Sequence, residues 1–563
     1  MLKLIPRVKF IEVKEAFIPV RAISGFTKGL DLRLEKAAST LPFDEKGLFL
    51  TININDGEGE EYTLDIDGDG IVISATGTRG AFYGIQTLAQ ILAHRNVPHL
   101  HIKDFPDLKF RGYYHDVTRG KIPKVETLKK LIDILAQTKH NVFQIYVEHV
   151  YDFPQYEGIK EKTGYYTADE IIEIRDYCEE NFIDFQPSLS CFGHLYELLE
   201  LDRYKHLKCR KEELSHENPW NERGRHHTLD PRKPESLELI KSLIDCYAPL
   251  FKSEWFNICC DETFDLQALE DEGCDYVELY VDFVTKIAEH VKSLGKRVMM
   301  WGDVARHHPE ALDRLPKDIM FIKWNYNQGA EEYLFERFKN RLHIVGPSVC
   351  SQGRLCEAIH YSVPIIKRII GFGLKYGSQG MLNTNWGDWG NPASIDNSLY
   401  GVIFGGAVAW DIETDDNDEV HSAVNKHIFK HATGLEIRRR INEMHRPILW
   451  HDFIKACMDT RLEREHKSII SEHDVYHAQH EYKIIMGEIP PNDDDSSVEM
   501  RLCTEGILLM YEYMGLMAGY PIKRITDTRA WLDLFSEKWR EKNKDDELYR
   551  VQEVFEWLMR KFG

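Results

Sequence analysis

The chain has 563 residues, which is more than a single domain normally holds, so we expect two or three domains. Its hydrophobic fraction of 43% supports a large core and excludes a globally disordered protein. A formal net charge of −21, without any strongly basic run, argues against nucleic acid as a partner.

The N-terminus lacks the apolar core and the small-residue cleavage site of a signal peptide, and no stretch approaches the ~20 apolar residues that span a bilayer. The cysteines form no pair of CxxC motifs, so we expect no zinc, no other metal and no cofactor. Reduced thiols and a cytoplasmic location are the simplest expectation for such a chain.

Residues 1–105 are predicted to form an N-terminal α+β domain. Alternating apolar residues predict three strands, joined as an antiparallel sheet, over 48–54, 62–66 and 70–74. A helix over 79–92 would cover this sheet with one apolar face, which contains Phe82, Ile85, Leu88, Ala89 and Leu92. No residue in this region suggests catalysis.

Residues 106–412 change to short apolar runs separated by longer helical patterns. Eight strands are predicted over 110–116, 141–147, 183–189, 255–259, 297–301, 320–324, 342–346 and 380–385. Helices between them are predicted over 124–138, 167–181, 234–247 and 276–294. Eight strand–helix repeats over roughly 300 residues predict an α/β fold, a catalytic (β/α)8 TIM barrel.

Residues 413–563 are predicted to form a C-terminal helical region. Its helices are expected over 420–433, 436–444, 497–517 and 528–561. No residue pattern in this region suggests chemistry. The helices could cover the barrel or provide the contact of a homodimer.

Active sites on this barrel fold lie at the C-terminal ends of the strands. In this chain nearly every predicted strand ends in residues that can bind or react, namely Asp116 and Arg119, Glu148 and His149, His194, Asp261 and Glu262, Trp301 and Asp303, Trp324 and Tyr326, and Trp386 and Asp388. A single tryptophan or acid is more often part of a core or a surface. Their common position at one end of the barrel predicts a functional site there.

Asp261 and Glu262 follow directly after the apolar strand 255–259. A strand end capped by two solvated acids is the structural alternative. Buried side by side, however, two carboxylates cost several kcal/mol unless they are paired, and their pKa values separate. The result is one acid and one base at neutral pH, which is what glycoside hydrolysis requires.

Two carboxylates from one segment suit the substrate-assisted form of this reaction. In that form the 2-acetamido oxygen of the sugar attacks the anomeric carbon. Asp261 would orient the acetamido N–H and stabilise the positive intermediate. Glu262 would protonate the leaving oxygen and then activate water.

The other residue types at the strand ends fit a sugar. Tryptophan faces pack on the apolar C–H surface of a pyranose, and Trp301, Trp324 and Trp386 could also enclose an acetamido group. Arg119 offers a planar fork to adjacent hydroxyls, and Asp388 could accept from another. His194 could hydrogen-bond one of the two carboxylates and tune its pKa.

Five segments resemble glycoside hydrolase family 20, the β-N-acetylhexosaminidases: Gly80–Leu88, Arg111–Arg119, Gly193-His194, Asp261-Glu262 and Trp386-Gly-Asp388. The resemblance covers roughly residues 45–412. It implies that Glu262 is the general acid/base, that Asp261 orients the acetamido group, and that His194 lies behind Glu262. It further implies that Arg119 binds the 3- and 4-hydroxyls, that Asp388 contacts the 4- and 6-hydroxyls, and that the acetamido group is enclosed by Trp301, Trp324 and Trp386.

The implied activity is that of an exo-acting β-N-acetylhexosaminidase, which releases terminal β-linked GlcNAc or GalNAc from a glycan, glycolipid or amino-sugar substrate. Two alternatives stay open at this point. One is a glycosidase with an altered hexosamine specificity. The other is a non-catalytic sugar-binding barrel, against which the intact Asp261-Glu262 pair argues.

The chain departs from the family pattern at four places. Cys259-Cys260 stands where the family usually has Gly-Gly, and Asp388 stands where many members have Glu. The second strand lacks the family's His-x-x-Asp, so Glu148 or His149 could replace the carboxylate that lies behind the acid/base. The segment 347–354 lacks the tyrosine that usually bonds the acetamido oxygen, and Tyr326 could take its place.

Overall fold

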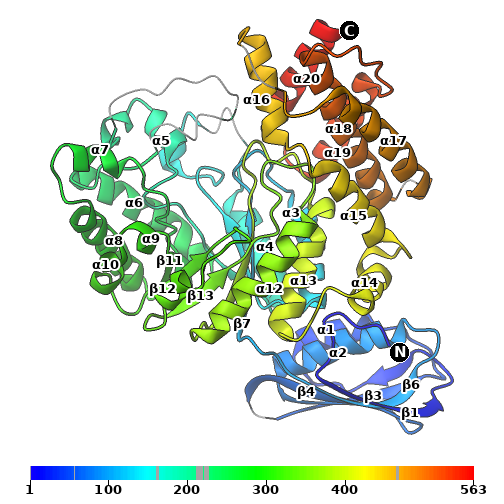
Figure 1. Ribbon diagram of the computed structural model, residues 1–563. Helices are drawn as coiled ribbons and strands as arrows, with labels where there is room; N and C mark the ends of the chain where they lie inside the picture. Colours follow the sequence, from blue (N-terminus) through cyan, green and yellow to red (C-terminus); the bar gives the residue numbers. More distant parts are fainter. Residues whose placement is uncertain are drawn as a thin grey trace.

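The computed structural model describes residues 2–55, 57–159, 164–210, 220, 227–464, 468–492 and 494–563. A sheet with two helices, a barrel and a group of long helices follow one another along the chain (Figure 1). Among the described residues, no helix combines the length and the apolar character that crossing a membrane would require.

The N-terminal region is a six-stranded sheet in the described part of the chain, in the order β1-β6-β4-β5-β3-β2. Its strands are β1 (Phe10–Phe17), β2 (Ile23–Phe26), β3 (Leu48–Ile54), β4 (Glu58–Ile66), β5 (Ile71–Gly77) and β6 (Pro98–Asp104). Helices α1 (Leu32–Ser39) and α2 (Thr78–Leu92) lie between this sheet and the barrel (Figure 1).

The prediction of an antiparallel sheet is wrong for part of this region. β4 pairs antiparallel with β5, as expected, but β3 pairs parallel with β5 and β2 pairs parallel with β3. The reason is that β5 lies between β3 and β4 instead of following them in order. The sheet is therefore mixed.

Eight parallel strands form the barrel, and the predicted TIM barrel is confirmed. They are β7 (Phe110–Asp116), β8 (Val142–Tyr146), β9 (Asp184–Gln186), β10 (Trp255–Asn257), β11 (Arg297–Trp301), β12 (Met320–Trp324), β13 (His343–Gly346) and β14 (Gly380–Asn385). A parallel bridge between Ser188 and Asn257 closes the cylinder between β9 and β10.

Helices surround the barrel because each one covers the outer face of the strands with an apolar stripe. The longer ones are α3 (Val125–Gln137), α4 (Ala168–Glu180), α6 (Pro234–Tyr247), α8 (Tyr276–Ser293), α12 (Ile359–Lys375) and α13 (Leu399–Trp410). Shorter helices lie in the loops: α5 (Tyr196–Glu200), α7 (Leu266–Asp271), α9 (Val304–His307), α10 (Pro309–Arg314) and α11 (Tyr333–Glu336).

Strand β10 ends two residues earlier than the sequence predicts. Cys259, Cys260 and Glu262 have φ angles of 56°, 59° and 47°, in the left-handed region. A strand cannot continue through such residues. The chain bends there instead, at the end of the strand where Asp261 and Glu262 stand.

The C-terminal region consists of helices α14 (Asp418–Val424), α15 (Gly434–His445), α16 (Trp450–Arg461), α17 (Glu472–Glu488), α18 (Asp495–Met517), α19 (Thr528–Lys542) and α20 (Leu548–Phe562). The prediction of one helix over 528–561 is wrong. The helix breaks after Lys542 because Lys544 N donates to Ile122 O at 2.8 Å and Asn543 forms a bridge with Pro123 of the barrel. The predicted helix 420–433 also ends early, at a π-helical turn over Asn425–Phe429.

The C-terminal helices pack on the loops that follow β13 and β14. The backbone N–H of Trp450 donates to Gly353 O, and its indole N–H donates to Trp389 O, both at 2.9 Å. Lys542 Nζ bonds Asp396 Oδ2 and Glu499 Oε1, each at 2.7 Å. The helical region thus supports loops at the barrel mouth.

Candidate active site

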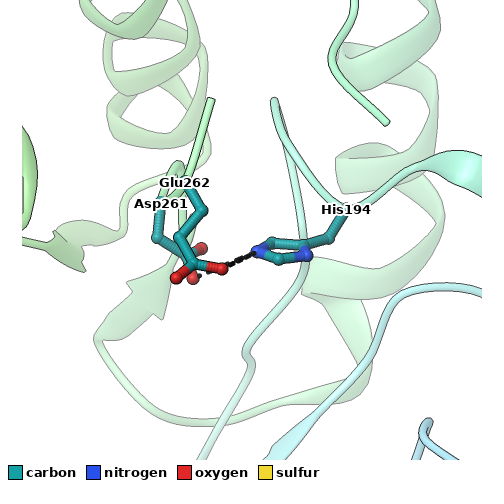
Figure 2. A group of neighbouring side chains, drawn as sticks. All are labelled: His194, Asp261 and Glu262. Atoms are coloured by element: carbon teal, nitrogen blue, oxygen red, sulfur yellow. Dashed lines mark ion pairs between the residues drawn. The ribbon is translucent and has the colours of Figure 1, made fainter. Parts of the chain in front are cut away.

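The side chains of Asp261, Glu262 and His194 point toward one another (Figure 2), and they follow strands β10 and β9 at their C-terminal ends. His194 Nε2 lies 3.4 Å from Asp261 Oδ2 and 3.4 Å from Glu262 Oε2. The Asp261 side chain is buried, whereas 37% of the Glu262 side chain is exposed. The loop carrying His194 can approach this closely because Gly193 has no side chain; a Cβ there would lie 2.6 Å from Asp261 O.

The charges of this triad stabilise one another. Burial alone would lower the pKa of His194, but the charge of Asp261 and the hydrogen bonds with Asp261 and Glu262 raise it to about 10. Burial alone would raise the pKa of Glu262, but the hydrogen bond and charge of His194, together with the charge of Arg119, lower it to about 2. In the unliganded site, His194 is therefore a cation and Glu262 a carboxylate.

Two further residues contact this triad: Asp303, which was among the predicted strand-end residues, and His227, which was not. The backbone N–H of His194 donates to His227 Nδ1 at 3.0 Å, and the two rings stack with centroids 5.1 Å apart. Asp303 Oδ2 accepts from Glu262 N at 3.0 Å. Burial and the charges of Asp261 and Glu262 raise the pKa of Asp303 to about 7. The position of Asp303 after β11 predicted its place at the barrel mouth. His227 follows no strand, and no sequence pattern indicated it.

Arg119 connects the triad to the other side of the mouth. Its Nη1 lies 3.2 Å from Asp388 Oδ1 and 3.6 Å from Asp116 Oδ2, and its Nη2 lies 3.5 Å from His194 Nδ1. The guanidinium also packs over the ring of Trp386, 5.0 Å from its centroid. The side chain is buried and held from several sides, so its fork has a fixed direction.

The second strand contributes Glu148 and His149, and the structure places both below the site. Glu148 Oε1 lies 3.6 Å from Arg119 Nε and accepts a hydrogen bond of 2.8 Å from Tyr146 OH. His149 Nδ1 lies 3.8 Å from Glu148 Oε2. Glu148 contacts Arg119 directly, whereas His149 contacts Glu148 behind it. The carboxylate on this strand therefore contacts Arg119 and not Glu262.

Aromatic side chains form the inner wall of the mouth. Trp301 and Trp386 have ring centroids 5.6 Å apart, and Trp324 stacks on Tyr326 at 4.9 Å. Trp386 Nε1 donates to Tyr326 OH at 2.7 Å. The structure therefore brings together all three predicted tryptophans and Tyr326.

The segment 347–354, which follows β13, contains no tyrosine. Ser351 Oγ donates to Asn385 Oδ1, and Cys350 has a left-handed φ of 56°. Tyr326 thus provides a phenol in the aromatic wall, although it comes from the end of β12. Burial raises the pKa of Tyr326 further than its hydrogen bonds with Thr384 and Trp386 lower it, so the phenol stays protonated and can donate.

The ligand atoms of His194, Asp261 and Glu262 lie within 4.8 Å of one another. Each residue could offer one of these atoms to a metal ion, which would replace the proton that the imidazole carries between the two carboxylates.

Two family models match this chain. One, described as glycosyl hydrolase family 20, catalytic domain, matches residues 108–341; the other, described as glycosyl hydrolase family 20, domain 2, matches residues 20–105. Together they cover more than half of the chain. Strands β13 and β14, with Trp386 and Asp388, lie beyond the matched residues.

Relatives with curated names share part of the chain. A β-hexosaminidase of Porphyromonas gingivalis is 28% identical in an alignment 282 residues long that covers 44% of this chain and 36% of that protein. A β-hexosaminidase of Vibrio furnissii is 27% identical in an alignment 315 residues long that covers 48% of this chain and 49% of that protein. The chain thus spans half or less of the length of these two relatives.

Solved structures share the fold over a greater length. A chitobiase of Flavobacterium johnsoniae has a TM-score of 0.64 and 19% identity, and the match covers 99% of both chains. An exo-β-N-acetylglucosaminidase of Vibrio harveyi, solved with N-acetylglucosamine, has a TM-score of 0.59 and 19% identity over 76% of each chain.

A closed barrel with an acid pair, an imidazole and an aromatic wall at its mouth defines a class of carbohydrate-processing proteins. The two family models identify the particular family within that class. The chain belongs to glycoside hydrolase family 20.

Proposed function

We propose that this protein is an exo-acting β-N-acetylhexosaminidase, which hydrolyses terminal β-linked GlcNAc or GalNAc by substrate-assisted catalysis with retention. One observation carries the proposal. Asp261 and Glu262, adjacent in the chain, both contact His194 Nε2 at the barrel mouth. Asp116, Glu148 and Asp388 are each paired with Arg119 instead. A nucleophile supplied by the substrate is consistent with that arrangement.

In the first step, the acetamido oxygen attacks the anomeric carbon while the bond from that carbon to the leaving oxygen breaks. Asp261 accepts from the acetamido N–H and stabilises the cationic ring that forms. Tyr326 donates to the acetamido oxygen. The proton of Glu262 goes to the leaving oxygen, and in the second step Glu262 takes a proton from the water that reopens the ring.

Glu262 must carry a proton before the first step, yet its pKa in the unliganded site is about 2. Binding of the substrate would raise this pKa. A sugar in the mouth would cover the exposed part of the Glu262 side chain, and desolvation disfavours a carboxylate. The proposal therefore requires that bound substrate raise the pKa of Glu262.

The first experiment measures initial rates on nitrophenyl β-GlcNAc, β-GalNAc and β-glucoside, with and without a GlcNAc-thiazoline inhibitor. Hydrolysis of the acetamido sugars alone, blocked by the thiazoline, is the expected result. Turnover of the glucoside would contradict substrate assistance and would require a nucleophile from the protein. No turnover with any of the three would favour the sugar-binding barrel.

A hexosaminidase with an altered specificity is the second candidate. The observation that favours it is the segment after β13, where Ser351 bonds Asn385 and no tyrosine contacts the site. The ratio of the β-GlcNAc and β-GalNAc rates in the same experiment measures this specificity.

A further inference from the structure

The loop after β14 carries Asp388, and the loop after β7 contacts it at several successive residues. Gly387 N donates to Asp116 Oδ2 at 3.0 Å, and Arg119 Nη1 lies 3.2 Å from Asp388 Oδ1. These two contacts hold the first part of the loop, next to the end of β14.

Two glycines let the loops approach each other closely further along. Gly120 and Gly390 have left-handed φ angles of 110° and 86°, and a Cβ on Gly120 would lie 2.4 Å from Gly390 O. This close approach brings the next residue, Lys121, against the far end of the loop after β14.

Lys121 binds that end of the loop with a buried side chain. The residue is 6% exposed, and its Nζ donates to Pro392 O at 2.9 Å and to Ala393 O at 2.7 Å. Among the described residues no other donor bonds these two carbonyls, and both residues are buried. Without Lys121, two backbone acceptors would therefore be buried and unpaired, which is costly.

The ammonium group of Lys121 has no acid as its partner. In the described part of the chain it forms no ion pair; Glu499, the acid that lines the same small cavity, is paired with Lys542. Its Nζ also lies 4.6 Å from the ring centroid of Trp539 on α19. A buried lysine with no acid beside it costs more than an apolar side chain of similar length. The two bonds to the loop are what the lysine gains over such a side chain.

These bonds do not depend on the charge of Lys121. Burial lowers the pKa of Lys121 to about 7, although the charge of Glu499 opposes this. A neutral amine still has two protons, which is one for each carbonyl. Lys121 can therefore bind the loop in both protonation states.

We propose that Lys121 is a positioning residue, which fixes the far end of the loop after β14 and thereby holds Asp388 in the orientation that binds the terminal sugar. The inference rests on the proposed function, because it uses the expected contact of Asp388 with the 4-hydroxyl. The loop is bonded at both ends, and Asp388 lies between them. With the far end released, Asp388 would keep only its pair with Arg119 and the bond of the neighbouring Gly387.

The test compares KM and kcat of the wild type and of Lys121→Met on aryl β-GlcNAc and aryl β-GalNAc. Methionine keeps most of the length of the side chain but has no donor. KM is expected to rise by about tenfold, the scale of a lost hydrogen bond to a charged group, whereas kcat should change much less, because the acid pair is not touched. The ratio of kcat/KM between the two sugars should move toward one, since they differ at the 4-hydroxyl. Lys121→Arg keeps the donors and should retain most of the affinity.

A double-mutant cycle with Asp388→Ala shows whether Lys121 acts through Asp388. If it does, Lys121→Met should have little further effect on KM once Asp388 is absent. A purely structural role of Lys121 would instead raise KM by the same factor in both backgrounds.

Lys296→Met is the matched control. Lys296 Nζ also donates to two backbone carbonyls, of Phe251 at 3.0 Å and of Ser253 at 2.7 Å, but it precedes β11 and so lies at the opposite end of the barrel. Its KM and its sugar ratio should equal those of the wild type. Thermal unfolding checks that each variant is folded. If Lys121→Met is not, Lys121→Gln, which keeps one amide donor, replaces it and should give an intermediate KM.

Three results would overturn the role of Lys121 while leaving the proposed function intact. These are an unchanged KM and sugar ratio in the folded Lys121 variant, equal effects in the wild-type and Asp388→Ala backgrounds, and the same rise of KM in Lys296→Met. Failure of the wild type to hydrolyse either sugar would instead contradict the proposed function. The affinity for free GlcNAc, measured by tryptophan fluorescence, needs no turnover and should weaken in Lys121→Met by the same factor as KM; an equal affinity would contradict the positioning role.

Discussion

At the scale of single residues, the site depends on one imidazole that two carboxylates share. His194 keeps Glu262 ionised in the unliganded protein, and Arg119 adds to that effect. Glu262 is also the more exposed of the two acids. The surroundings of the two carboxylates therefore differ although they are neighbours in the chain.

Glu262→Gln is expected to reduce hydrolysis of an aryl β-GlcNAc by roughly a hundredfold or more, because an amide cannot transfer the proton to the leaving oxygen. The initial rate measures this. Glu270→Gln, on the exposed surface of α7, is the control for a lost carboxylate and should retain the wild-type rate. A rate near wild type in Glu262→Gln would remove Glu262 from the mechanism.

Tyr326→Phe is expected to lower kcat/KM for aryl β-GlcNAc by about tenfold, the scale of a lost hydrogen bond. The phenol would no longer donate to the acetamido oxygen, and Trp386 Nε1 would lose its acceptor. Tyr333→Phe on the exposed helix α11 is the control. If kcat/KM does not change, Tyr326 does not replace the tyrosine that the segment after β13 lacks.

The pKa of His194 predicts how stability depends on pH. It is about 10 in the folded protein, above the ordinary value of 6.5, so the stabilisation is complete below pH 6.5 and is lost as the pH rises through 10. The free energy of unfolding should fall across this window with a slope of up to about 1.4 kcal/mol per pH unit.

Denaturant titrations at several pH values measure this slope. Lys121 and Lys323 have pKa values lowered by burial to about 7 and about 8, and they titrate in the same window. The comparison must therefore be with His194→Gln, in which the His194 contribution to the slope disappears. Equal slopes in the two proteins would show that His194 is not protonated in the folded state.

At the scale of elements, the turn after β10 gives the site its shape. Cys259 and Cys260 adopt left-handed φ angles that ordinary side chains avoid at a cost of roughly 1–2 kcal/mol per residue. Glycine has no such penalty. The family's usual Gly-Gly at these positions would meet this requirement without strain, and the two cysteines meet it with their side chains buried.

Cys260→Gly is therefore expected to be more stable than Cys260→Ala by about 1 kcal/mol, because both lose the thiol but only alanine keeps the left-handed penalty. Cys178, inside helix α4, is the matched control: there alanine should be more stable than glycine by about 0.5–1 kcal/mol. Chemical denaturation measures both pairs. The same order at both positions would contradict a left-handed Cys260.

At the scale of the whole molecule, the C-terminal helices act on the barrel mouth. They support the loops of Gly353 and Trp389 through Trp450, and they fix Asp396 through Lys542. The helical region thus supports the loops that follow β13 and β14.

Lys542→Met is expected to lower the free energy of unfolding by about 1–3 kcal/mol, since it leaves Glu499 and Asp396 without their shared cation. Lys538→Met, on the same helix, removes only a pair with Glu541 and should change it by less than about 0.5 kcal/mol. Thermal unfolding compares the two. Equal effects of the two substitutions would show that the ion pairs of Lys542 with Asp396 and Glu499 do not stabilise the fold.

Much of this protein follows from its sequence. Short apolar runs separated by helical patterns predicted all eight barrel strands, because parallel strands buried on both faces are continuous apolar runs. The predicted ends of β9 and β10 were two or three residues too late. Since the fold aligns all strand ends, the sequence also predicted that Asp261, His194, Arg119 and the tryptophans share one mouth. The mixed N-terminal sheet was missed, because strand order depends on contacts between distant residues.

Other features depend on tertiary contacts, which a local sequence pattern cannot predict. The tertiary structure alone placed His227 against the triad, since that contact joins separate loops. It ended helix α19 at Lys542, where a barrel carbonyl competes for the backbone of Lys544. Burial and pairing are properties of the whole fold, and they fix the charges on which the chemistry depends.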